Sequence, residues 1–104
     1  METIYIDYGL YTQFSVDLSD FNFNGVEKLV LTVKRYIGAN TRTIFVREYT
    51  SSDKHIEVIT PEESKLFDGG RIRYDFIAFM TSGEVYRASD VGEMRLRKGV
   101  GTIE

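Results

Sequence analysis

The sequence predicts an all-β protein built from two antiparallel sheets packed face to face, and three observations lead to this prediction. Apolar and polar residues alternate in many short runs, as they do in strands with one buried face. Turn signals such as Asn24-Gly25 and the stretch 38–40 separate these runs. The length of 104 residues, with 42% hydrophobic and 28% charged residues, suits one globular domain.

The first strands are identified by this alternation. In the segment 27–36, EKLVLTVKRY, apolar residues at Leu29, Leu31 and Val33 alternate with Val30, Thr32 and Lys34. The same period predicts buried positions in two other runs, at Phe14, Val16 and Leu18 upstream and at Ile56 and Val58 downstream. On this interpretation His55 and Glu57 lie on the solvated face of their strand.

A longer strand is expected at 71–80, where one face carries Ile72, Tyr74, Phe76, Ala78 and Met80. Its opposite face begins with arginines and ends with Ile77 and Phe79, which indicates that this half is central in a sheet or covered. The turn at 81–83 predicts a hairpin into residues 85–87. A final strand at 93–98 points Met94 and Leu96 inward.

One short helix is expected near residues 61–67. Thr60 can cap its N-terminus, Pro61 suits the first helical position, and Glu63 completes a capping box. Gly69 and Gly70 end it. Seven or eight short strands with one helix favour an immunoglobulin-like antiparallel β-sandwich, as a single domain over residues 1–104. A small β-barrel is the alternative, because strand count does not tell whether the sheet edges pair.

Composition excludes several classes of function. The chain has no cysteine, so it has neither disulfides nor thiolate metal sites. With 13 basic and 16 acidic residues its formal net charge is -3, which disfavours nucleic acid as a partner. No segment resembles a secretory signal or a membrane span, so we expect a protein made in the cytoplasm with no membrane partner.

Residues that could support catalysis form no recognisable pattern. His55 could share a strand face with Asp53 and Glu57, as a metal site or an oriented base would require, but a solvated strand face has the same appearance. A glycosidase-like pair of carboxylates could be formed by almost any two of four acidic residues, and the sequence selects no particular pair: Asp75, Glu84, Asp90 and Glu93. We therefore expect no enzyme activity, no catalytic residue, no bound metal and no cofactor.

Two groups of residues are candidates for partner binding. Basic residues concentrate in the last third of the chain and would form a band if its three strands are neighbours, although pairing with Asp75, Glu84 and Glu93 would neutralise much of it. The aromatic N-terminal segment contains tyrosines that suit an interaction surface or a sugar-stacking platform. The candidate residues are Tyr5, Tyr8, Tyr11, Arg71, Arg73, Arg95 and Arg97, with Arg87 and Lys98 in the same band.

The segment from Ile56 to Val100 contains I-x-V-I-T-P-E-E-S-x-L followed by a glycine-started strand with R-Y-D-F and a glycine hairpin. This pattern resembles the immunoglobulin-like N-terminal domain of phage baseplate upper proteins and related small prophage tail-associated proteins. The match covers less than half the chain, and its most specific part runs from the helix to the Tyr74-Asp75 pair.

The resemblance implies a non-enzymatic structural or assembly protein of a phage or prophage particle. Its partners would be other tail or baseplate proteins, or further copies of itself as a homo-oligomer. It would be made in the cytoplasm of the bacterial host and reside in the virion. Free sheet edges and the aromatic N-terminal segment would then be docking surfaces. The alternative is a carbohydrate-binding module that uses the N-terminal tyrosines.

Overall fold

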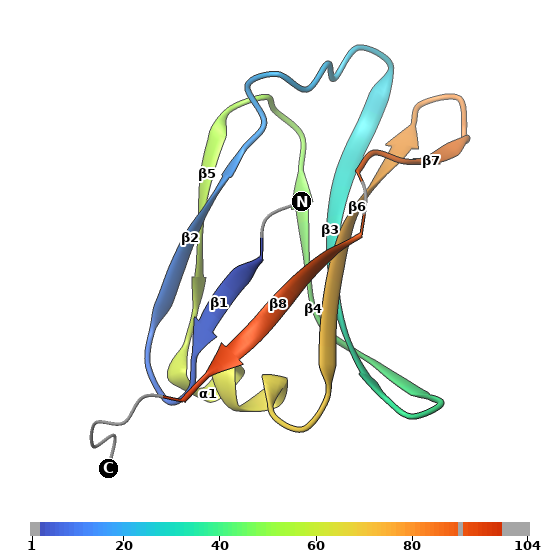
Figure 1. The fold of residues 1–104 in the computed structure, drawn as a ribbon. Coiled ribbons are helices and arrows are strands. Elements are labelled where there is room, and N and C mark those ends of the chain that lie inside the picture. The colour runs from blue at the N-terminus through green and yellow to red at the C-terminus, as the bar shows by residue number, and fades with distance from the viewer. Residues whose placement is uncertain (1–2, 90, 99–104) are drawn as a thin grey trace.

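A computed structural model describes residues 3–89 and 91–98 and contains two β-sheets that face each other (Figure 1). The large sheet has the order β1 (Ile4–Asp7), β8 (Gly92–Arg97), β6 (Arg71–Met80), β3 (Val26–Ile37) and β4 (Asn40–Tyr49), with β7 (Val85–Arg87) also paired to β6. The small sheet pairs β2 (Thr12–Asp17) with β5 (Lys54–Ile59). The sheets do not close on each other, so the predicted sandwich is confirmed and the barrel alternative is wrong.

Most strand pairs are antiparallel, as predicted, but β1 runs parallel to β8 with Ile4 opposite Met94. The reason is the route of the chain. The turn after β1 carries the chain from the large sheet to the small one, where β2 pairs with β5, so β1 has only the edge of the last strand available. The amide of Tyr8 donates a hydrogen bond to the carbonyl of Arg97 (3.1 Å) and extends this contact.

The core lies between the two sheets and consists mainly of the residues that alternation predicts. Leu29, Leu31 and Val33 are at most 1% exposed. β6 is central, between β3 on one side and β7 and β8 on the other, which explains why its outward Ile77 and Phe79 are half-buried. The buried apolar cluster also includes Ile6, Val16, Leu18, Phe45, Tyr49, Ile59, Phe67, Ile72, Tyr74, Ala78 and Met94.

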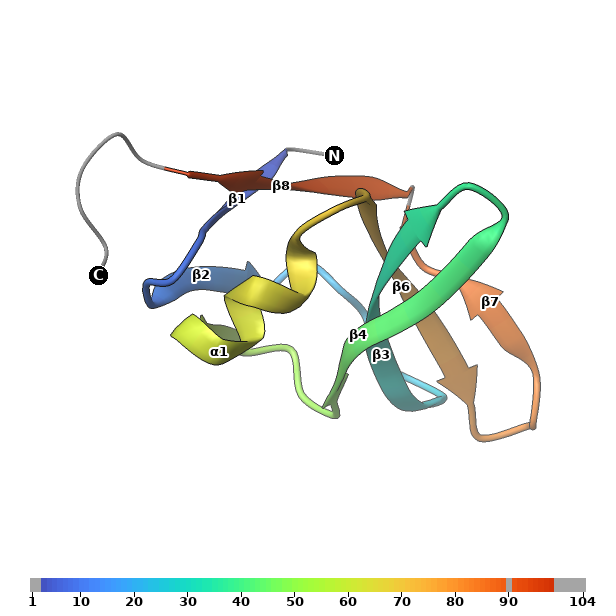
Figure 2. The same ribbon diagram turned by 90° about the horizontal axis from the view of Figure 1, so that it is seen from below.

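The predicted helix is confirmed as α1 (Pro61–Ser64), continued by a 3-10 turn at Lys65–Phe67. Thr60 and Glu63 form the capping box in both directions. The buried Ser64 hydroxyl donates to the carbonyl of Pro61 (2.6 Å) and accepts from the amide of Gly9 (2.8 Å), which ties the helix to the turn after β1. Seen from below, α1 closes one end of the space between the sheets (Figure 2).

The prediction for β5 is wrong about which face is buried. Ile56 and Val58 are 53% and 43% exposed, and the alternate residues, His55 and Glu57, point toward the interior. Glu57 accepts hydrogen bonds from the Tyr49 hydroxyl (2.6 Å) and from Nε of Arg47 (3.0 Å). These bonds satisfy the polar groups inside the sandwich, and Ile59 on the same face of β5 is fully buried, so Ile56 and Val58 are left outside.

Candidate interaction face

The outward face of the large sheet carries most of the chain's clustered positive charge. The strand registers place seven basic and four acidic side chains on this face, which gives it a net charge of +3. The whole chain, in contrast, has a formal net charge of -3. We name this surface the basic face. Its cations are Lys28, Lys34, Arg71, Arg73, Arg87, Arg95 and Arg97, and its anions are Asp7, Glu48, Asp75 and Glu93.

Each carboxylate on the basic face already has a cationic partner. The pairs are Lys28–Glu48 (3.7 Å), Arg87–Asp75 (2.8 Å), Arg95–Glu93 (3.4 Å) and Arg97–Asp7 (2.8 Å). Of the seven cations on this face, all of them in the described part of the chain, Lys34, Arg71 and Arg73 are left without an ion pair. Because Lys34 lies directly opposite Arg73 in the ladder, two like charges are held together, an arrangement that favours binding of an anion.

Two of the unpaired cations, Lys34 and Arg73, border a shallow hollow on the same face, together with the paired Asp75 and Arg87. It has a volume of about 360 Å³, and its lining includes Thr32, Lys34, Tyr36, Arg73 and Ile77. The Arg73 guanidinium lies 5.8 Å from the centre of the Tyr36 ring. A flat aromatic ring, arginines and a lysine together offer both apolar contact and charge-assisted hydrogen bonds, the chemistry of a surface that receives a carboxylate-bearing partner.

The Arg97–Asp7 ion pair links β8 to β1 on the basic face. Two hydrogen bonds join them, from Nε to Oδ1 (2.8 Å) and from an Nη to Oδ2 (3.2 Å). The hydrogen bond from Arg97 lowers the pKa of Asp7, and the same bond raises the pKa of Arg97. Both groups are exposed to solvent, so the pair orients β1 against β8 and adds little to stability.

The predicted arginine residues do come together. Arg71 and Arg73 on β6 lie beside Arg95 and Arg97 on the neighbouring β8, and β7 brings Arg87 to the other side of β6. Pairing with Asp75 and Glu93 neutralises part of the band, as foreseen, but Glu84 bonds to Ser82 and Tyr86 instead. Lys34 and Tyr36 were not among the predicted site residues, because only the register of β3 against β6 places them beside Arg73 and Arg71.

The three N-terminal tyrosines do not form one platform. Tyr5 lies on the basic face with Arg97 5.4 Å from its ring, whereas Tyr8 lies in the turn after β1 with Lys98 4.9 Å from its ring. Tyr11 is 71% exposed at the start of the small sheet. Two of the three rings are therefore each covered on one side by a cation of the same chain.

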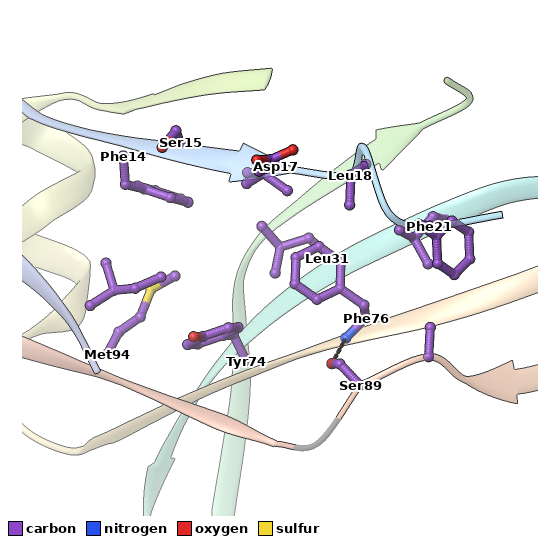
Figure 3. Close-up of a pocket in the computed structure, with 14 residues that line it drawn as sticks. Phe14, Ser15, Asp17, Leu18, Phe21, Leu31, Tyr74, Phe76, Ser89 and Met94 are labelled. Carbon is purple, nitrogen blue, oxygen red and sulfur yellow. Dashed lines mark hydrogen bonds between the residues drawn. The ribbon is translucent and has the colours of Figure 1, made fainter. Parts of the chain in front are cut away.

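A second surface feature is a cleft between the two sheets (Figure 3). Its volume is about 570 Å³, and it opens between the edge of β2 and the segment that joins β7 to β8. Phe14 and Leu18 line the β2 side, and Tyr74, Phe76 and Met94 line the large-sheet side. The Ser89 hydroxyl accepts a hydrogen bond from the amide of Phe76 (3.1 Å) at its rim.

The residues considered for catalysis do not converge. The His55 ring contacts the Tyr49 ring at a tilt of 48°, with 4.7 Å between ring centres, while Asp53 accepts a hydrogen bond from Ser51 (2.9 Å). Asp90 lies outside the described residues. Within residues 3–89 and 91–98, no group of three or more histidine, aspartate and glutamate side chains is placed to hold a metal ion. The same residues include no helix of the length and apolarity that a membrane crossing needs.

The sheet order and the open sandwich define an immunoglobulin-like domain, and solved structures agree. Murine CRIg is 12% identical and matches over 94% of both chains with a TM-score of 0.57. The extracellular domain of the voltage-gated sodium channel beta4 subunit is 12% identical over 95% of this chain and 92% of its own, with a TM-score of 0.54. No protein-family model and no curated protein matches the sequence.

Proposed function

We propose that this chain is a non-enzymatic assembly protein of a phage or prophage particle and that it acts through protein–protein contacts at its basic face. The observation that carries the proposal is the Lys34, Arg71 and Arg73 cluster. All four carboxylates on that face are engaged elsewhere, so the cluster is uncompensated on a chain of net charge -3. An acidic surface on a neighbouring tail or baseplate subunit would supply the missing counter-charges.

Two further considerations support this class. The sodium channel beta4 structure is described as a parallel homodimer that explains cell–cell adhesion, so an immunoglobulin-like sandwich of this kind can serve as a contact module. The resemblance of the segment 56–100 to baseplate upper proteins gives the particle context. Carbohydrate binding is the alternative, with Tyr11 as its most exposed ring, and a glycan-array signal lost in Tyr11→Ala would favour it.

The proposal that this chain is part of a phage particle can be tested with particles from the bacterium that carries its gene. After prophage induction in the host bacterium, particles are purified by density gradient and their proteins are quantified by mass spectrometry. We expect this chain to band with the tail proteins, and to persist after a wash that removes free cytoplasmic proteins. Particles that contain a complete set of tail proteins but lack this chain would overturn the proposal.

A further inference from the structure

The small sheet has only two strands, so β2 has an edge that no described strand covers. The amide of Leu18 donates to the carbonyl of Asp53 (3.3 Å), and hydrogen-bonded pairs in an antiparallel ladder alternate. It follows that Val16 and Phe14 exchange main-chain hydrogen bonds with β5. The main-chain groups of the alternate residues, Gln13, Ser15 and Asp17, therefore point to the uncovered edge.

This edge borders the apolar cleft of Figure 3. Ser15 and Asp17 line the cleft, and Leu29, Leu31 and Met94, each 1% exposed, form its floor. An extended chain that adds to the sheet would pair with these free amide and carbonyl groups and would cover the cleft of about 570 Å³ beside them.

The strand lacks the features by which edge strands are usually protected. Its sequence, TQFSVD, contains no proline, glycine or lysine, and its register with β5 shows no bulge. The only charge is Asp17 at its end. Hydrogen bonds from the side chain of Ser19 and from its amide (3.0 Å) lower the pKa of Asp17. Nothing in β2 therefore opposes pairing with another strand.

We infer that two copies of this chain pair antiparallel through β2, with Ser15 at the centre of the two-fold contact. From Gln13 to Asp17 the strand reads polar, apolar, polar, apolar, polar, and this pattern is the same in both directions. Antiparallel pairing about Ser15 places Gln13 opposite Asp17 of the second copy and Phe14 opposite Val16 of the second copy. No like charges meet, so the edge is complementary to itself.

The dimer has a continuous four-stranded sheet in the order β5, β2, β2, β5. The two clefts open on the side of the shared edge, so each faces the other and both are removed from solvent. The basic faces belong to the large sheets and stay available for other partners. The dimer is therefore independent of the proposed function, and either can fail without the other.

Proline substitutions distinguish the two edges of the small sheet. Ser15→Pro removes an amide that points to the uncovered edge of β2 and leaves the ladder with β5 intact. Ile56 is the register partner of Ser15, and its amide points to the opposite edge, so Ile56→Pro is the matched control. The masses of the wild-type chain, 12.0 kDa as a monomer, and of both variants are measured by light scattering after size-exclusion chromatography.

We expect the wild type and Ile56→Pro to be dimers at micromolar concentration, and the dissociation constant of Ser15→Pro to rise at least about tenfold. Circular dichroism verifies that each variant is folded. A wild type that is monomeric up to about 100 µM, or a folded Ser15→Pro that dimerises as the wild type does, would overturn the inference.

A cysteine scan keeps the inference testable if Ser15→Pro does not fold. The chain has no cysteine, so Ser15→Cys introduces one thiol per copy. Residues in a hydrogen-bonded antiparallel pair have Cα atoms about 5.5 Å apart, within the range of a disulfide. We expect Ser15→Cys to form a covalent dimer under mild oxidation while Ile56→Cys stays reduced. Equal cross-linking of the two variants would contradict the β2 contact.

Discussion

Glu57→Ala should lower the free energy of unfolding by about 2–4 kcal/mol, because the buried carboxylate has two hydrogen-bond donors that lose their acceptor. The Tyr49 hydroxyl is 2.6 Å from it and Nε of Arg47 is 3.0 Å from it. The Glu57 side chain is only 14% exposed, so water does not readily replace the lost bonds. Urea unfolding of the variant and the wild type measures the difference.

Tyr49→Phe provides the control, since it removes one donor and leaves the Arg47–Glu57 pair (3.0 Å) in place. The double variant should lose less stability than the two single variants together, because both break the same bond. A Glu57→Ala variant less than about 0.5 kcal/mol below the wild type would contradict a structural role for this network.

The same network predicts sensitivity to alkali. Burial, followed by the hydrogen bond to Glu57, raises the pKa of Tyr49 well above its usual value of 10.0. A raised pKa in the folded state gives a stabilising contribution that is complete below the unfolded value, near 10, and declines as the pH rises above it. Tyr49→Phe lacks this titration, so its stability should fall less steeply above pH of about 10.

Gly92→Ala should destabilise the protein by about 2–3 kcal/mol, because no space exists for a side chain at the start of β8. A methyl group there would lie 2.6 Å from Cε1 and 2.7 Å from the hydroxyl oxygen of Tyr74. Tyr74 is 5% exposed and packs in the core, so its ring can give way only by disturbing neighbours. Thermal unfolding followed by circular dichroism measures the loss.

Val91→Ala is the matched control for Gly92→Ala, since Val91 precedes it in the chain and is 49% exposed. The free energy of unfolding of this variant should stay within about 0.5 kcal/mol of the wild-type value. The double variant Gly92→Ala with Tyr74→Leu should lose less stability than the sum of the losses in the two single variants, because the smaller leucine makes room for the new methyl group. Full additivity would mean that the clash with Tyr74 is not the cause.

Local signals were sufficient to predict some elements and insufficient for others. The capping box from Thr60 to Glu63 depends only on neighbours in sequence, and it forms as predicted. Leu29, Leu31 and Val33 form a long alternating run whose buried face is unambiguous. Ile56 and Val58 are only two apolar residues, and their strand faces the other way because Ile59 is buried on the opposite face and Glu57, on that same face, has hydrogen-bond partners on β4.

The candidate site depends on register, which a single sequence does not specify. The arginines on β6 and β8 could be predicted as a band because the two strands follow one another closely in the last third of the chain. Lys34 joins them only through the pairing of β3 with β6 across a long sequence separation. The uncovered edge of β2 could not be predicted either, since it results from the number of strands that the small sheet contains.

Binding of the purified protein to particles tests the central claim most directly. Arg71→Glu with Arg73→Glu reverses the uncompensated cluster, and Arg42→Glu with Lys65→Glu reverses the same number of exposed charges away from the basic face. In co-sedimentation with particles lacking this chain, the first pair should reduce binding at least about tenfold, and the second pair should bind as the wild type does. Equal binding of both double variants would contradict docking through the basic face.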